Sequence, residues 1–238
     1  MSKIFDAYRK KVGDTPDLAI ELGKAGSVSL YPVPEGSQRN DFNKLANKLL
    51  GLRPENRGAV LAFGSSAAGE GASFVSYNAA VYLATVYHQK VAWIDANFLS
   101  PQKKLMGQER KSFSNILRDP SRVDDLVVTE NPLLIPVGSE LVTARGLLAD
   151  QNYGELLRAF SRRFDFVIID LPPVLVSDDT ALLAASADGF LLVIEQKYLK
   201  REVIDHGLKG MKDKGVRLLG SVINRRTYEL PKMIYDRL

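Results

Sequence analysis

A glycine- and serine-rich run at residues 64–73 (GSSAAGEGAS) has the composition of a phosphate-binding loop that lacks its lysine. In such a loop, Gly69 and Gly71 let successive backbone N–H groups converge on phosphate oxygens, and the helix that follows adds its positive end. Ser73 supplies the hydroxyl that holds Mg²⁺ in this motif. Ala72 stands at the lysine position, so the loop carries no cation of its own for the terminal phosphates.

The missing charge bears on both binding and catalysis. A hydrogen bond to a charged group contributes about 1.5–3 kcal/mol, so its loss weakens nucleotide binding about 10- to 100-fold. Phosphoryl transfer suffers more, because cations stabilise the transferred group. We expect ATP or ADP with Mg²⁺ to bind weakly or not at all, with the Glu70 side chain facing solvent or tuning the local field. The expected nucleotide contacts within the loop are Ser66, Gly69, Glu70, Gly71, Ala72, Ser73 and Phe74.

Two aspartates follow apolar runs further along the chain. Asp170 follows Val-Ile-Ile and matches the second acidic element of P-loop ATPases, whose carboxylate faces the Mg²⁺ site. Asp95 ends another apolar run and is expected near the metal or the attacking group. We predict Asp95 and Asp170 as catalytic residues and Ser73, Asp95 and Asp170 as metal ligands. The alternative for each aspartate is a capping role at a strand end.

A dinucleotide-binding loop is the other class to weigh. The pair Gly69-x-Gly71 opens a helix, and Asp95 follows at the end of a strand, which partly matches that fingerprint. The third glycine position is Phe74, whose ring opposes close packing of helix and strand. An NAD(P)-binding oxidoreductase is therefore kept as an alternative, as is a glycine-rich turn with no ligand.

The elements that position these residues begin at Gly58. Runs that are apolar throughout are typical of strands buried on both faces, and their alternation with helices predicts a parallel sheet. We predict an α/β fold with a doubly wound, mostly parallel sheet flanked by helices, which binds ligands beyond the carboxyl ends of its strands. The predicted strands are 60–63, 91–95, 133–137, 166–170, 190–195 and 218–223, and the predicted helices are 41–50 and 73–86.

The first forty residues have a different composition. Residues 1–12 predict a short amphipathic helix, and 13–39 carry Gly and Pro at intervals typical of a linker. We predict two parts, an N-terminal helix and linker over 1–40 and a P-loop NTPase-like domain over 41–238.

Composition narrows the function classes. The 238 residues carry a net charge of +4 on scattered basic side chains, which predicts solvated faces and no nucleic-acid surface. The absence of cysteine excludes disulfides, thiolate zinc sites and cysteine nucleophiles. No run approaches the ~20 apolar residues of a membrane span. We expect a cytoplasmic protein that reaches a membrane only through a partner.

Taken together and in this order, the motifs resemble the bacterial tyrosine-kinase family, the CpsD, CapB and Wzc group of MinD-like (SIMIBI) P-loop ATPases. The resemblance implies a place at the inner face of the membrane beside a polysaccharide co-polymerase (Wzz-type) or other exopolysaccharide machinery. It also implies that Asn224 faces an adenine base, with Arg225 beside the nucleotide. The matching stretches are SSAAGEGAS (65–73), IDAN (94–97), FDFVIIDLPP (164–173), SDD (177–179) and GSVINR (220–225).

The departures from that family are as informative. Besides Ala72, the second acid of the IDAN motif is Asn97, and two arginines of the family's ring-forming helix are Asn43 and Ala46. Several separate losses favour a natural degenerate homologue over a single inactivating substitution. The arginine losses disfavour the family's ring but not another homo-oligomer such as a dimer. The family's tyrosine-rich tail is reduced to Tyr228 and Tyr235.

Three hypotheses follow. The preferred one is a pseudokinase-like P-loop protein that serves as a regulatory or scaffolding partner in exopolysaccharide or capsule synthesis and export. The second is an active ATPase or tyrosine autokinase, which takes its missing cation from Lys200, Arg201, Arg225 or a partner chain and modifies Tyr228 or Tyr235. The third is the NAD(P)-dependent oxidoreductase.

Overall fold

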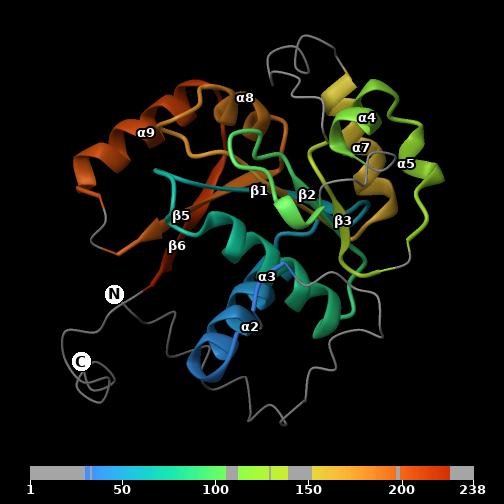
Figure 1. Cartoon of the computed structure of the whole chain (residues 1–238), viewed down its shortest axis with the longest axis horizontal. Coiled ribbons are helices and arrows are strands. Elements are labelled where there is room, and N and C mark those ends of the chain that lie inside the picture. Colours follow the sequence, from blue (N-terminus) through green and yellow to red (C-terminus); the bar gives the residue numbers. More distant parts are fainter. Residues whose placement is uncertain are drawn as a thin grey trace.

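A six-stranded parallel sheet forms the centre of the protein. The structure is a computed structural model that describes residues 30–32, 34–105, 112–128, 130–138, 152–196 and 199–225. Its strand order is β3-β2-β4-β1-β5-β6, and every pairing is parallel, which confirms the predicted sheet (Figure 1). The strands are β1 (Ala59–Ser65), β2 (Val91–Asp95), β3 (Leu133–Ile135), β4 (Phe166–Asp170), β5 (Gly189–Glu195) and β6 (Leu218–Asn224).

Helices cover both faces of this sheet (Figure 1). One face carries α2 and α3, and the longer helices of the opposite face are α7, α8 and α9. No helix in the part of the chain that the structure describes is long and apolar enough to cross a membrane. The helices are α2 (Gly36–Leu50), α3 (Ala72–Thr85), α4 (Phe113–Arg118), α5 (Arg122–Asp125), α7 (Asn152–Arg163), α8 (Asp179–Ala185) and α9 (Arg201–Asp213), with a 3-10 turn η1 (Lys103–Leu105).

The apolar strands are explained by burial on both sides. Along β1, Leu61 and Phe63 belong to the core under α2 and α3, whereas Val60 and Ala62 belong to the core under the other helices. Because successive side chains of a strand point to opposite faces, a strand between two cores must be apolar at every position. The sheet centre is therefore fixed in place, and the loop that leaves β1 starts from a rigid support.

The first described helix departs from its expected start. We predicted α2 from Asp41, but it begins at Gly36, directly after its N-cap residue Glu35. No proline follows Pro34 before the helix ends, so nothing stops the helix from extending back to that point. Residues 36–40 of the predicted linker are thus helical. The predicted N-terminal helix at 1–12 and the tail tyrosines Tyr228 and Tyr235 lie outside the described residues.

Candidate nucleotide site

The glycine-rich loop joins the centre of the sheet to α3. It leaves β1 between the ends of its neighbours β4 and β5. Gly69 and Gly71 both have φ of +90°, a left-handed conformation that favours glycine. Gly71 is the N-cap of α3, and no side chain caps the helix there. The N–H groups of the first turn are therefore available for an anion.

Glu70 does not face solvent, so the first of its two expected roles was wrong. Its side chain is fully buried, with Oε2 accepting a hydrogen bond from the Ala67 N–H at 2.7 Å. Its Oε1 accepts a second hydrogen bond from the Glu195 N–H, at the end of β5, at 3.2 Å. A buried carboxylate needs such partners, and the loop backbone and β5 provide them. Glu70 thus positions the loop instead of pointing out of it.

The end of β6 holds the loop from another side. Asn224 Nδ2 donates to the Glu70 carbonyl at 2.8 Å, and Arg225 donates to the Gly69 carbonyl at 3.2 Å. Arg225 also forms an ion pair with Glu195 at 2.9 Å, which offsets its charge. The structure brings both residues to the loop, where the Asn224 amide is engaged with backbone, and the adenine contact of Asn224 stays a prediction. A Cβ at Gly71 would lie 2.2 Å from Asn224 Nδ2, so a larger residue there would displace this amide from the Glu70 carbonyl.

The lysine position is turned toward the core. Ala72 is the first residue of α3, is 7% exposed, and packs in the apolar cluster beneath α2 and α3. The Ser66 hydroxyl in the same loop is buried and has no hydrogen-bond partner among the described residues. The loop therefore keeps a buried polar group, the Ser66 hydroxyl. At position 72 it has a methyl group in place of a lysine side chain.

The two aspartates meet as predicted. Asp95 and Asp170 are register partners at the ends of β2 and β4, and both are buried. Asp95 accepts hydrogen bonds from the Asn97 N–H at 3.1 Å and the Gln102 N–H at 2.7 Å, so it also caps the turn after β2. Both oxygens of Asp170 lack a hydrogen-bond partner of ordinary geometry within the described residues. The capping role accordingly accounts for Asp95 but not for Asp170.

Burial makes this pair hard to ionise. Burial raises the pKa of Asp95 to about 6, against the opposing effect of its two backbone hydrogen bonds. Burial, followed by the neighbouring Asp95 charge, raises the pKa of Asp170 well above its ordinary value, and the Ser73 and Ser76 hydroxyls oppose this rise. A cation between the two carboxylates would relieve both effects.

The residues present fit a magnesium ion bound with a nucleotide. No group of three or more His, Cys, Asp and Glu side chains within the described ranges could hold a metal by itself. Mg²⁺, however, is usually held by one or two carboxylates together with phosphate oxygens and water. The buried Asp170 oxygens, Asp95 and the Ser73 hydroxyl form such a set.

We expect stability without metal to depend on pH through Asp95. Its pKa is raised on folding from 3.8 to about 6, so the stability it contributes is present at low pH and lost as pH rises through that window. The free energy of unfolding should fall by on the order of 1–3 kcal/mol between pH 4 and 7. Urea unfolding in chelator, with Asp95→Asn beside the parent protein, measures this. Identical pH profiles for the two proteins would contradict the assignment.

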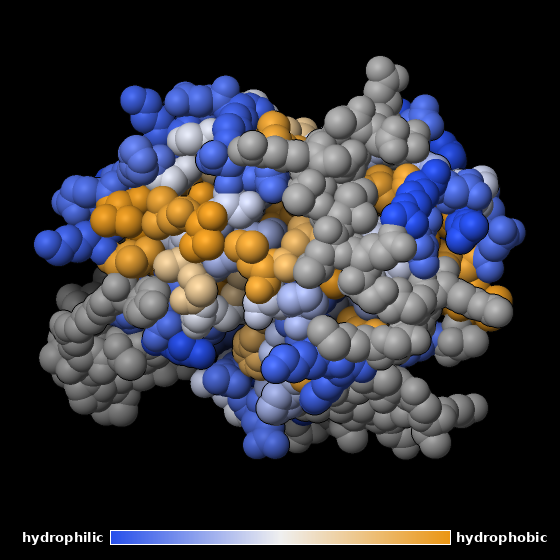
Figure 2. All heavy atoms as spheres, turned by 45° about the horizontal axis from the view of Figure 1, so that its top comes forward, coloured by the Kyte–Doolittle hydropathy of each residue, from blue (hydrophilic) through white to orange (hydrophobic). Residues whose placement is uncertain are grey.

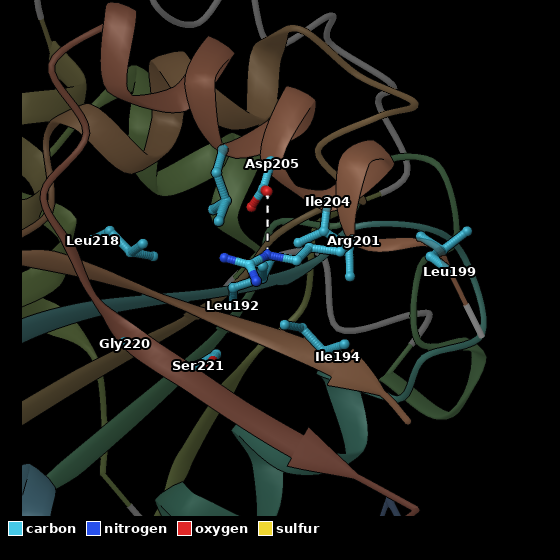
Figure 3. Close-up of a pocket in the computed structure, with 10 residues that line it drawn as sticks. Leu192, Ile194, Leu199, Arg201, Ile204, Asp205, Leu218, Gly220 and Ser221 are labelled. Carbon is cyan, nitrogen blue, oxygen red and sulfur yellow. Dashed lines mark ion pairs between the residues drawn. The ribbon is translucent and has the colours of Figure 1, made fainter. Parts of the chain in front are cut away.

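A separate hollow lies between α9 and the strands β5 and β6, on the face of the sheet opposite to α3. It has a volume of about 350 Å³ between these strands and α9 (Figure 3). Figure 2 shows apolar side chains gathered on this side of the molecule, where Figure 1 places α9. Arg201, one of the expected cation donors, pairs with Asp205 at 3.5 Å in the wall of this hollow. No residue of the glycine loop lines it, so it is distinct from the nucleotide site.

Sequence reasoning missed one residue of the site. Tyr31 lies in the segment interpreted as linker, yet its hydroxyl shares hydrogen bonds with the Ser73 hydroxyl and the Gln102 side chain. Burial and the nearby Asp170 carboxylate raise the pKa of Tyr31 to about 12. The available signal was weak, namely the apolar pair Leu30-Tyr31 among prolines and glycines.

The fold and site together define the class of the protein. A glycine loop between the central strand and a helix, with carboxylates at neighbouring strand ends of a parallel sheet, is the arrangement of P-loop NTPases. The prediction of that class is confirmed, and the dinucleotide-binding alternative is not supported.

The relatives specify the class further. No family profile matches the chain. It is 28% identical over 191 residues to tyrosine-protein kinase CpsD of Streptococcus agalactiae, covering 77% of this chain and 82% of that protein. It is 26% identical over 218 residues to tyrosine-protein kinase wzc of Salmonella typhimurium, covering 90% of this chain and 28% of that protein.

Solved structures share the fold of this chain. The kinase domain of Escherichia coli tyrosine kinase ETK superposes with a TM-score of 0.71 at 21% identity, covering 97% of this chain and 89% of that one. Cobyrinic acid a,c-diamide synthase from Mycobacterium smegmatis, with bound ADP and magnesium, has a TM-score of 0.55 at 20% identity, covering 76% and 82%. The homologues of this chain are bacterial tyrosine kinases, which are MinD-like P-loop ATPases.

Proposed function

We propose that this chain is a pseudokinase-like P-loop protein that binds ATP or ADP with Mg²⁺ weakly and turns it over slowly or not at all. It would act as a regulatory or scaffolding partner in exopolysaccharide or capsule synthesis and export. The kinase homologues support the pathway, and the composition of the loop supports the loss of turnover.

One contrast within the site carries this proposal. The groups that would receive a metal nucleotide are retained, since the Asp170 oxygens and the Ser66 hydroxyl are buried with no hydrogen-bond partner of ordinary geometry in the part of the chain that the structure describes. The fixed cation is lost, since Ala72 packs in the core and the nearby Arg225 is paired with Glu195. Because the binding groups are retained and the cation that assists phosphoryl transfer is missing, we expect the nucleotide to be bound but rarely hydrolysed.

Each residue then has a defined role. Backbone N–H groups from Gly69 to Ser73 would bind the phosphates, and Ser73, Asp95 and Asp170 would hold Mg²⁺, which neutralises phosphate charge. Asp95 would also accept a proton from any attacking group, because its raised pKa of about 6 suits that task. A nucleotide held in this way stabilises one conformation of the loop and its neighbours.

Two residues of α2 give independent support for a non-catalytic role. Ala46, at one family arginine position, is fully buried on the face of α2 that packs on the core, so an arginine has no room there. Asn43, at the other, accepts a hydrogen bond from the Tyr87 hydroxyl at 2.8 Å within the same chain. Both positions serve internal packing, which disfavours the family's ring assembly and leaves other homo-oligomers open.

We place the protein in the cytoplasm, at the inner face of the membrane through a membrane polysaccharide co-polymerase (Wzz-type) or other exopolysaccharide machinery. Deleting the coding gene should change the amount or chain length of surface polysaccharide. Unchanged polysaccharide would contradict the pathway assignment.

An active autokinase is the second candidate, favoured by the position of Arg225 against the loop and by the raised pKa of Asp95. Calorimetric titration with Mg²⁺·ATP, together with a phosphate-release assay, distinguishes the two. We expect weak saturable binding that Ser73→Ala removes and that Ser186→Ala, at the exposed end of α8, leaves unchanged. Sustained phosphate release by the natural sequence would defeat the pseudokinase proposal.

A further inference from the structure

A short segment before α2 is docked against α3 and the turn after β2, beside the candidate nucleotide site. Leu30 is 5% exposed, and its N–H donates to the Tyr77 hydroxyl of α3 at 3.3 Å. Its carbonyl accepts a hydrogen bond from Lys104 Nζ, in the turn after β2, at 3.1 Å. These contacts come from two elements, α3 and the turn after β2, and both elements also carry residues of the site, namely Ser73 and Gln102.

Tyr31 is held within this segment by two aromatic rings. Its ring meets the edge of Phe74 at 5.7 Å between centroids and lies against Tyr77 at 5.6 Å. Phe74 and Tyr77 belong to the first turns of α3, directly after the phosphate loop. Two such contacts fix the direction of a tyrosine, because each favours a particular ring geometry.

The hydroxyl of Tyr31 therefore reaches the polar centre of the site. It shares hydrogen bonds with the Ser73 hydroxyl and the Gln102 side chain, and it senses the charges of Asp170 and Asp95. Three of these residues, Ser73, Asp95 and Asp170, are the set that fits Mg²⁺. A hexahydrated or partly hydrated Mg²⁺ needs the space between them for its octahedral ligands. The phenol hydroxyl and the metal thus require the same partners.

We propose that Tyr31 competes with the metal nucleotide within the same chain. The Tyr31 side chain occupies the metal side of the site until Mg²⁺ and nucleotide displace that side chain. This inference rests on the proposed nucleotide site and adds a residue that regulates access to it. Binding has to break the hydrogen bonds of Tyr31 as it forms those of the metal. The apparent affinity is reduced by the fraction of molecules in which Tyr31 is in place.

The test is the affinity of Tyr31→Phe for a non-hydrolysable ATP analogue, measured by calorimetry with Mg²⁺ and again in chelator. This substitution keeps the ring that packs on Phe74 and removes the hydroxyl alone. The substitution removes a hydrogen bond that the Tyr31 hydroxyl makes when it occupies the site. Mg²⁺-dependent binding of the analogue should therefore tighten about 3- to 10-fold. The gain should disappear in chelator, since the competition is for the metal ligands.

Tyr82→Phe is the matched control, because Tyr82 is a buried tyrosine of α3 whose ring packs on Phe42 and whose hydroxyl has no hydrogen-bond partner among the described residues. We expect this control to bind like the natural sequence. Equal or weaker binding by Tyr31→Phe, with clear binding by the natural sequence, would overturn the inference and leave the proposed function intact. No binding by either protein at millimolar analogue would overturn both.

Discussion

Replacing Ala72 by lysine is expected to tighten Mg²⁺·ATP binding about 10- to 100-fold, the equivalent of one hydrogen bond to a charged group. Phosphate release should rise by a similar or larger factor, because the cation acts mainly on the transferred group. Ala72 is the first residue of α3 and is buried, so the lysine stem must run along the apolar surface while its ammonium group reaches the loop.

Ala68→Lys provides the control for this substitution. Ala68 lies in the same loop and is exposed, so its lysine adds the same charge without reaching the terminal phosphates from the helix start. Calorimetry and phosphate release should separate the two variants, and thermal unfolding would show whether the buried stem costs stability. Equal gains from both lysines would mean that general charge attraction, and not the vacant lysine position, limits binding.

Replacing Asp170 by asparagine should have the second largest effect, with opposite signs on binding and on stability. The Mg²⁺-dependent part of nucleotide binding should weaken about 10- to 100-fold, since the metal loses a carboxylate partner. The metal-free protein should become more stable at pH 7. Burial raises the pKa of Asp170, so its stabilising contribution is lost as pH rises through the folded pKa, whereas asparagine carries no such dependence.

Measuring nucleotide binding and the free energy of unfolding also reveals whether the Asp170 side chain serves only to stabilise the fold. Asp213→Asn changes an exposed carboxylate on α9 and should alter neither property. If Asp170→Asn destabilised the metal-free protein across the whole pH range, the carboxylate would be a packing element whose removal disrupts the sheet end. The metal assignment would then have to rest on Asp95 alone.

Much of the scaffold was predictable because its signals are local. The runs ending at Asp95 and Asp170 are apolar at every position, and a strand between two cores has to be, so those strands were placed at their observed bounds. The loop was predictable for a similar reason. Gly69 and Gly71 adopt a left-handed backbone that favours glycine, so their spacing marked the turn before α3.

The start of α2 was less well determined. Residues 36–40 carry glycine, serine and asparagine, which have low helix propensity, and they were therefore assigned to the linker. In the structure the helix begins at Gly36. Propensity is a weak guide where an established helix can extend by one more turn and no proline interrupts it.

By itself, then, the sequence determined the class of fold, the phosphate loop and the absence of a lysine from it. Only the tertiary structure decided which distant groups complete the site. Glu70 is buried because Glu195 offers its N–H from a strand far along the chain, and Tyr31 reaches Ser73 because Phe74 and Tyr77 hold its ring. Such contacts depend on which elements become neighbours when the sheet forms, and no local pattern of residue types encodes that.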